Sequence, residues 1–322
     1  MSFYEDTMAD FDRMLNYRKS VGFATATYEY SVPPFIEYSA SNHPDATQIN
    51  KIMVDEWLAH YPYKTKSSQA VFISMLRRFT SFINAQGKSS FIPDEDYSLK
   101  KEQYQPYIFN DHELTTLFDA IDAYVPYYGY KTKYQGDLIV PVLFRMMYCC
   151  GMRPAEPLHL KSEDVDLITG EVYIRETKHN KERHIIMSED MLKLCQEYKN
   201  RIGTHEWFFP HPDGEYLKTS WMTYQFHVCW NRSGLSKKGN PRPYDLRHAF
   251  ATRTMMRWID EGKDVMVLLP YLSNYLGHAE ITSTLYYIHL LPDRIRKSSG
   301  INWSMFSAIY EEADSHEKNK RS

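Results

Sequence analysis

Two phrases in the last third of the chain bring together an arginine, a histidine and a tyrosine. The first, Pro-Tyr-Asp-Leu-Arg-His-Ala-Phe-Ala-Thr at 243–252, supplies Arg247. The second, at 276–289, supplies His278 after a glycine and Tyr287 nine residues later. A guanidinium can bind two phosphate oxygens at once, a histidine can donate a further hydrogen bond, and a phenol can act as a nucleophile. Together these residue types predict attack of a tyrosine on a phosphodiester.

A second arginine precedes a predicted helix in the middle of the chain. Arg153 follows Gly151, which ends an apolar helix pattern, and it precedes Pro154, a favoured first residue of a helix. Glu156 lies three residues further on the same helical face, where its carboxylate could orient a neighbouring basic group. On this motif alone an ordinary surface ion pair is the simpler interpretation, because short motifs often match by chance.

A basic turn between two short strands offers a further candidate. The segments 171–175 and 183–187 have strand patterns, and the polar turn between them predicts a β-hairpin. Lys178 lies in that turn, with Lys181 and Arg183 nearby. Such a turn can enter a nucleic-acid groove, and a lysine can protonate a departing alkoxide. A solvated, charged hairpin tip explains the same residues equally well.

Composition restricts the class of partner. The 322 residues suffice for two domains, and a formal net charge of −3 argues weakly against a nucleic-acid binder. A small net charge can still conceal a basic surface, and residues 237–257 hold six basic residues against one acidic residue. We expect DNA contacts from this segment and from the hairpin. The expected contact residues are Lys181, Arg183, Lys237, Lys238 and Arg242.

Cysteines and apolar runs indicate the compartment. The four cysteines form no Cys-x-x-Cys pair, the first residues do not resemble a signal peptide, and no apolar run approaches the length of a membrane span. These features predict a cytoplasmic protein with reduced thiols and no membrane partner.

The periodicity of apolar residues predicts two domains. An all-α domain is expected over 1–87, followed by a polar linker at 88–108 and a mainly α domain with the hairpin over 109–300. The C-terminal piece 301–322 begins with an apolar segment that can pack on its own domain or on a neighbouring protomer. Helices are expected at about 4–21, from 25 with a break at Pro33 and Pro34, and at 48–60, 66–86, 137–150, 188–202, 219–233, 244–260, 264–276 and 280–290.

The motifs occur in a fixed order: Arg-x-x-Glu, a lysine in a hairpin, Leu-Arg-His, Leu-Gly-His and then a tyrosine. In this order the sequence resembles the tyrosine recombinase (phage integrase) family, which includes Cre and the Xer recombinases. The resemblance covers about residues 105–290 as a catalytic domain and 5–86 as a helical core-binding domain. It implies a two-domain, mainly α fold with a small β-hairpin or sheet. The implied catalytic residues are Arg153, Lys178 (less readily Lys181), Tyr244, Arg247, His278 and Tyr287, with Glu156 as a supporting residue.

One position departs from the family pattern. The family most often has a histidine three residues before its second arginine, whereas this chain has Tyr244. A phenol can donate a hydrogen bond to phosphate, but it is a poor base near neutral pH because its reference pKa is about 10. His248, adjacent to Arg247, is expected to point elsewhere on its helix.

The resemblance also implies a reaction and an assembly. The tyrosine forms a 3′-phosphotyrosine and leaves a free 5′-hydroxyl, the lysine protonates that oxygen, and no ATP, metal or other cofactor is required. The resemblance implies a homo-tetramer on double-stranded DNA recombination sites. Without DNA, the protein can be a monomer. Three alternatives are a DNA-binding member of the same fold without the chemistry, a type IB topoisomerase, and a metal-dependent nuclease or transposase.

Overall fold

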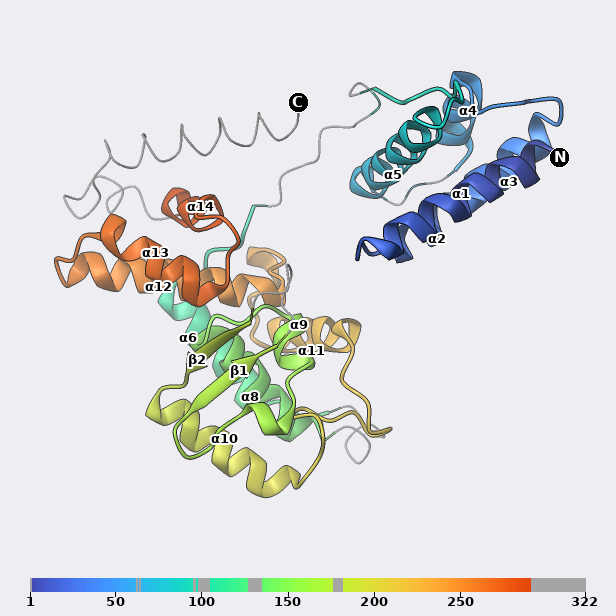
Figure 1. Ribbon diagram of the computed structural model, residues 1–322. Coiled ribbons are helices and arrows are strands. Elements are labelled where there is room, and N and C mark those ends of the chain that lie inside the picture. The colour runs from blue at the N-terminus through green and yellow to red at the C-terminus, as the bar shows by residue number, and fades with distance from the viewer. Residues whose placement is uncertain are drawn as a thin grey trace. The chain divides into compact units, whose positions relative to one another are not determined.

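The chain divides into two units, Met1–Gln105 and Pro106–Ser322. The computed structural model describes residues 2–61, 63, 65–94, 97, 105–126, 135–175 and 182–290, apart from the side chain of His289 (Figure 1). The junction between the units lies within the segment predicted as a linker. The C-terminal piece 301–322 lies outside the described residues.

The first unit consists of helices packed around aromatic side chains. The helix predicted from residue 25 is divided, because α2 ends at Ser31 and α3 begins at Pro33, where the missing N–H of proline costs nothing. In the core, Phe35 contacts both Trp57 and Phe72. The helices are α1 (Phe3–Ser20), α2 (Ala26–Ser31), α3 (Pro33–Asn42), α4 (Lys51–His60) and α5 (Lys66–Asn84).

The second unit is built around α8 (Gly136–Cys149), which packs against α10 (Glu189–Ile202) and α12 (Pro243–Asp260). Its strands β1 (Glu171–Ile174) and β2 (Arg183–Ile186) pair antiparallel. The predicted fold class, mainly α with a small hairpin, is confirmed. The remaining elements are α6 (Asp111–Asp122), α9 (Ala155–Leu158), η2 (Ser162–Asp164), α11 (Thr219–Arg232), η3 (Ser236–Lys238), α13 (Val265–Leu276) and α14 (Thr282–Leu290).

The turn between α13 and α14 places the second motif of the sequence. Asp264 caps the start of α13 by accepting a hydrogen bond from the backbone N–H of Met266. Gly277 ends this helix with a φ of 66°, in the left-handed region that favours glycine. His278 follows at once, and Tyr287 lies on α14. Within the described part of the chain, no helix is long and apolar enough to cross a membrane.

Candidate active site

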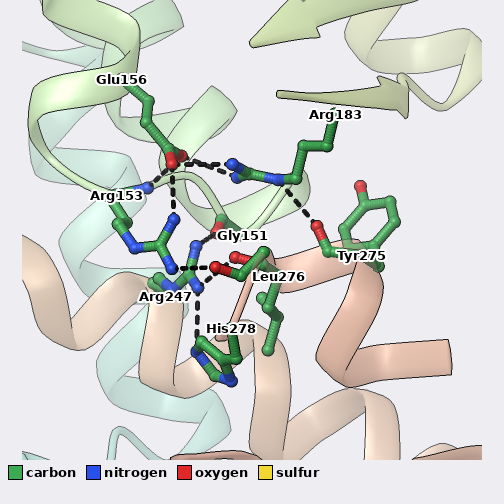
Figure 2. A network of polar contacts seen from close by, with 9 residues as sticks. Gly151, Arg153, Glu156, Arg183, Arg247, Tyr275, Leu276 and His278 are labelled. Atoms are coloured by element: carbon green, nitrogen blue, oxygen red, sulfur yellow. Dashed lines mark hydrogen bonds and ion pairs between the residues drawn. The ribbon is translucent and has the colours of Figure 1, made fainter. Parts of the chain in front are cut away.

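Arg247 lies at the centre of the site with a side chain that is 0% exposed. It projects from α12, and its Nη1 donates to the carbonyl oxygen of Gly151 at 2.7 Å (Figure 2). Its Nη2 lies 2.6 Å from the carbonyl oxygen of Leu276 and 3.0 Å from Nε2 of His278. Nε of Arg247 is buried and has no hydrogen-bond partner among the residues that the structure describes. The guanidinium therefore retains an unused donor inside the protein.

Arg153 and Glu156 form the ion pair that the Arg-x-x-Glu spacing predicted. Nη1 of Arg153 donates to Oε1 of Glu156 at 2.9 Å, and its backbone N–H donates to Oε2 at 2.7 Å. Nη2 of Arg153 donates to the carbonyl oxygen of Gly277 at 2.5 Å. The pair is not an ordinary surface pair, because the Glu156 side chain is only 6% exposed and that of Arg153 18%.

Arg183 occupies a position that the sequence did not predict. Its Nη1 and Nη2 donate to the two oxygens of Glu156 at 2.8 and 2.7 Å, and its Nε donates to the carbonyl oxygen of Tyr275 at 2.8 Å. The side chain is 8% exposed. The expectation that Arg183 contacts DNA does not fit this position, because the guanidinium is turned inward to a carboxylate. The two partners lie 27 and 92 residues away in sequence, beyond any local pattern.

Three arginines alter the ionisation of Glu156. Burial by itself raises the pKa of a carboxyl group, but the hydrogen bonds and charge of Arg183, the charge of Arg247 and the backbone N–H of Arg153 outweigh it. The pKa of Glu156 is therefore lowered, and the group is ionised near neutral pH. One carboxylate thus faces three guanidiniums, which leaves an excess of positive charge that suits an anion.

The last turn of α13 receives hydrogen bonds from all three arginines. The carbonyl oxygens of Tyr275, Leu276 and Gly277 each accept from a different guanidinium (Figure 2). The final carbonyls of a helix have no partner within the helix and lie at the negative end of its dipole. Cations are therefore favoured there, and the end of α13 holds the three side chains in one cluster.

His278 is neutral and held at both nitrogens. Burial, followed by the charges of Arg247, Arg153 and Arg183, lowers its pKa to about 3. Nη2 of Arg247 can only donate, so Nε2 of His278 accepts, and the proton lies on Nδ1. Nδ1 therefore donates to the hydroxyl of Thr284, at 2.7 Å. Arg247 thus sets the tautomer, the buried threonine helps to hold the orientation of the ring, and no sequence motif pointed to this threonine.

Tyr287 is buried beside these groups, with 2% of its surface exposed. Its ring lies nearly parallel to that of His278, with 6.0 Å between centroids and 20° between planes. Burial raises the pKa of Tyr287 to about 12, against the opposing effect of Arg247. The neighbouring Tyr286 is exposed. The structure therefore brings Tyr287, and not Tyr286, to the arginine cluster.

His248 lies against the same tyrosine, although the sequence suggested that it would point elsewhere. Its ring is 5.4 Å from that of Tyr287 and 4.9 Å from that of Tyr244, between centroids. Tyr244 and His248 are four residues apart on α12 and so share a face. Burial, and then the charge of Arg247, lowers the pKa of His248 to about 4. Its buried Nδ1 has no hydrogen-bond partner within the described segments.

The remaining candidates lie on exposed elements or outside the described residues. Lys178 and Lys181 belong to the segment 176–181, which lies outside the described residues. Lys237, Lys238 and Arg242 are exposed, on η3 and at the start of α12, so their DNA contacts stay predictions. No group of three or more His, Cys, Asp or Glu side chains in the described ranges could hold a metal ion.

Acidification should destabilise the folded chain through His278 and His248. In the folded protein the pKa is about 3 for His278 and about 4 for His248, below the ordinary value of 6.5. Between these values and pH 6.5 the unfolded chain therefore binds more protons than the folded chain. Their contribution is complete above about pH 6.5 and is lost as pH falls toward those values. At pH 5 we expect a loss of roughly 1–2 kcal/mol for each histidine.

Thermal unfolding of the DNA-free protein at pH 7 and pH 5 measures this effect. The same comparison with His248→Gln and His278→Asn should show a smaller drop between the two pH values. An unchanged drop in both variants would assign the acid sensitivity to other groups.

Comparison with known proteins identifies similar sequences and folds. The sequence model of the phage integrase family matches residues 109–294. The putative integrase/recombinase y4rE of Sinorhizobium fredii (strain NBRC 101917 / NGR234) is 26% identical over 287 residues, which cover 86% of this chain and 89% of that protein. The XerH site-specific recombinase bound to palindromic difH substrate, a post-cleavage complex, is 21% identical with a TM-score of 0.60 and coverages of 84% and 78%. A lambda integrase tetramer bound to a Holliday junction is 16% identical with a TM-score of 0.63 and coverages of 91% and 78%.

Proposed function

Because the chain belongs to the phage integrase family and is a site-specific DNA recombinase, we propose that it cleaves and rejoins DNA strands through Tyr287. Attack of the phenol oxygen on a DNA phosphorus forms a 3′-phosphotyrosine, and the bond from phosphorus to the 5′ oxygen breaks. The observation that carries this proposal is the burial of Tyr287 on the ring of His278, beside Arg247 with its unpaired Nε.

Arg153 and Arg247 bind the scissile phosphate in this proposal. Arg153 is the more accessible of the two and can offer its remaining N–H groups to a non-bridging oxygen. The free Nε–H of Arg247 finds its acceptor in the same phosphate. Guanidiniums that are already fixed stabilise the charge of the pentacoordinate transition state without reorganising. His278 adds a hydrogen bond once the anion has raised its pKa and Nε2 carries a proton.

Two proton transfers complete the step. The phenol of Tyr287 must lose its proton, and His248 is a neutral base whose ring contacts it and whose Nδ1 has no partner among the described residues. A bound phosphate raises the pKa of His248, which strengthens it as an acceptor. Tyr244 serves as a hydrogen-bond donor to the phosphate. Lys178, in the hairpin turn, supplies the proton that the departing 5′ oxygen needs.

The energetics and the assembly follow from the same chemistry. One phosphate ester replaces another, so the reaction needs no ATP, and the arginines supply the positive charge that a metal ion would otherwise provide. The similarity to a lambda integrase tetramer on a Holliday junction supports a homo-tetramer on double-stranded DNA as the active assembly. The exposed Lys237, Lys238 and Arg242 are proposed to contact the DNA backbone.

Covalent capture of DNA tests the proposal. The protein is incubated with nicked duplexes of randomised sequence, denatured and separated by electrophoresis, and the attached DNA is sequenced to define the site. We expect an adduct that forms in EDTA, is absent from Tyr287→Phe and persists in the matched control Tyr286→Phe. An adduct in Tyr287→Phe would overturn the assignment of the nucleophile, and a requirement for metal would favour a nuclease or transposase.

A further inference from the structure

Arg183 joins three segments that are distant in sequence. It is the first residue of β2. Its Nη1 and Nη2 donate to the carboxylate of Glu156 at the start of α9, and its Nε donates to the carbonyl oxygen of Tyr275 in the last turn of α13. All three of its nitrogens therefore donate within the protein. The buried position, at 8% exposure, gives this side chain no surface to present to DNA.

The carboxylate of Glu156 is shared evenly between two arginines. Oε1 accepts from Nη1 of Arg153 and Nη1 of Arg183, at 2.9 and 2.8 Å. Oε2 accepts from the backbone N–H of Arg153 and from Nη2 of Arg183, both at 2.7 Å. Because each oxygen receives one bond from each arginine, loss of Arg183 removes half of the bonds that orient the carboxylate and leaves Arg153 as its only partner among these contacts.

The close packing at Gly277 supports the same conclusion. A side chain built there would lie 3.2 Å from Cδ and Nη1 of Arg183 and 3.4 Å from Nη1 of Arg153. The backbone that leads to His278 is thus in contact with both guanidiniums. Any shift of Arg183 is transmitted to Arg153 through Glu156 and to the α13–α14 turn through Tyr275 and Gly277.

We propose that Arg183 is a positioning residue for DNA cleavage, which orients Arg153 toward the scissile phosphate through Glu156 and fixes the α13–α14 turn that carries His278. This inference rests on the proposed function. Arg183 does not touch the DNA, and its effect falls on the cleavage rate rather than on DNA affinity. A misplacement of a phosphate-binding group by about 1 Å is enough to lower a rate about 100-fold.

Two substitutions separate positioning from DNA contact. Arg183→Lys keeps the charge but loses the fork, and Arg183→Gln loses both. We expect single-turnover adduct formation to fall about 10-fold in the first and about 100-fold in the second. The affinity for the captured DNA site and its dependence on salt should be unchanged. A salt slope reduced by about 0.9 would instead show a lost phosphate contact and overturn the proposal.

A charge-neutral substrate separates positioning from a general structural role. A methylphosphonate at the scissile position removes the negative charge that Arg153 would neutralise. The ratio of the wild-type rate to the Arg183→Gln rate should therefore fall toward one on this substrate. An undiminished difference would mean that the variant is merely misfolded or distorted, and the proposal would fall.

Matched variants keep the test decisive. Arg175→Gln removes another hairpin arginine that pairs with an acid, Asp164, away from Glu156, and should leave cleavage unchanged. If Arg183→Gln does not fold, the double variant Glu156→Gln/Arg183→Gln, which leaves no unpaired carboxylate, takes its place. Its rate relative to the wild type is then compared on the phosphodiester and on the methylphosphonate substrate, as for the single variant. Absence of an adduct from the wild type would refute the proposed function. A wild-type adduct formed equally fast by the Arg183 variants would refute only the role of Arg183.

Discussion

Arg247→Lys is expected to lower the rate of covalent adduct formation about a thousandfold. A lysine keeps the positive charge but has one nitrogen where arginine has three. It cannot bond Gly151, Leu276 and His278 at once and still present a donor to phosphate. The rate is measured under single-turnover conditions on a nicked DNA site, with enzyme in excess.

Arg253→Lys is the control for this prediction, since Arg253 lies on the same helix but is only partly buried and pairs with Asp111. It should cleave at the wild-type rate. Thermal unfolding must show that Arg247→Lys remains folded at the assay temperature. A folded Arg247→Lys protein that cleaves within about tenfold of the wild type would contradict the central role given to this guanidinium.

Gly151→Ala is expected to destabilise the second unit by about 3 kcal/mol or more. Gly151 has a φ of 60°, and an added Cβ would lie 2.5 and 2.8 Å from two ring carbons of Phe250 and 3.1 Å from Leu276. A ring held by the packing of α12 cannot move aside as the end of a flexible side chain can. The melting temperature of that unit should fall by about 6–12 °C.

Gly234→Ala is the matched control, because its φ of 76° is similar but nothing lies within 4 Å of the added carbon. It should cost only the conformational penalty of about 1–2 kcal/mol. Phe250→Leu combined with Gly151→Ala should recover part of the loss by relieving the contact. Equal destabilisation by the two single alanine variants would show that backbone conformation alone, and not the ring, restricts position 151.

The sequence predicted several residues that the structure places close together, because the spacing of motifs is local information. The Arg-x-x-Glu pair and the residues after Gly277 are fixed by helix geometry and a helix end, and the structure brings them together. The helices of both units were likewise predictable from apolar periodicity, and Pro33 marked the division between α2 and α3. The catalytic roles of these residues stay predictions.

What the sequence missed depends on contacts between distant segments. The basic segment before Arg183 predicts that it contacts DNA, yet its partner Glu156 precedes it by 27 residues. Helix geometry predicts that His248 points away from the site, because adjacent helix residues diverge. Both it and Arg247 nevertheless face the cluster, since α14 packs on α12. Neither arrangement follows from local periodicity, because each depends on tertiary packing.

Hydrogen bonds from three guanidiniums to successive carbonyls connect the arginine cluster to the helix that carries Tyr287. The protein itself supplies the oxygens that occupy these donors, and the segment supplying them continues through Gly277 and His278 into the helix of Tyr287. A displacement of this segment would therefore disturb the arginine cluster and the position of Tyr287 together. Tyr287, which is 2% exposed, is thus held in place through the same arginines that are proposed to bind the scissile phosphate.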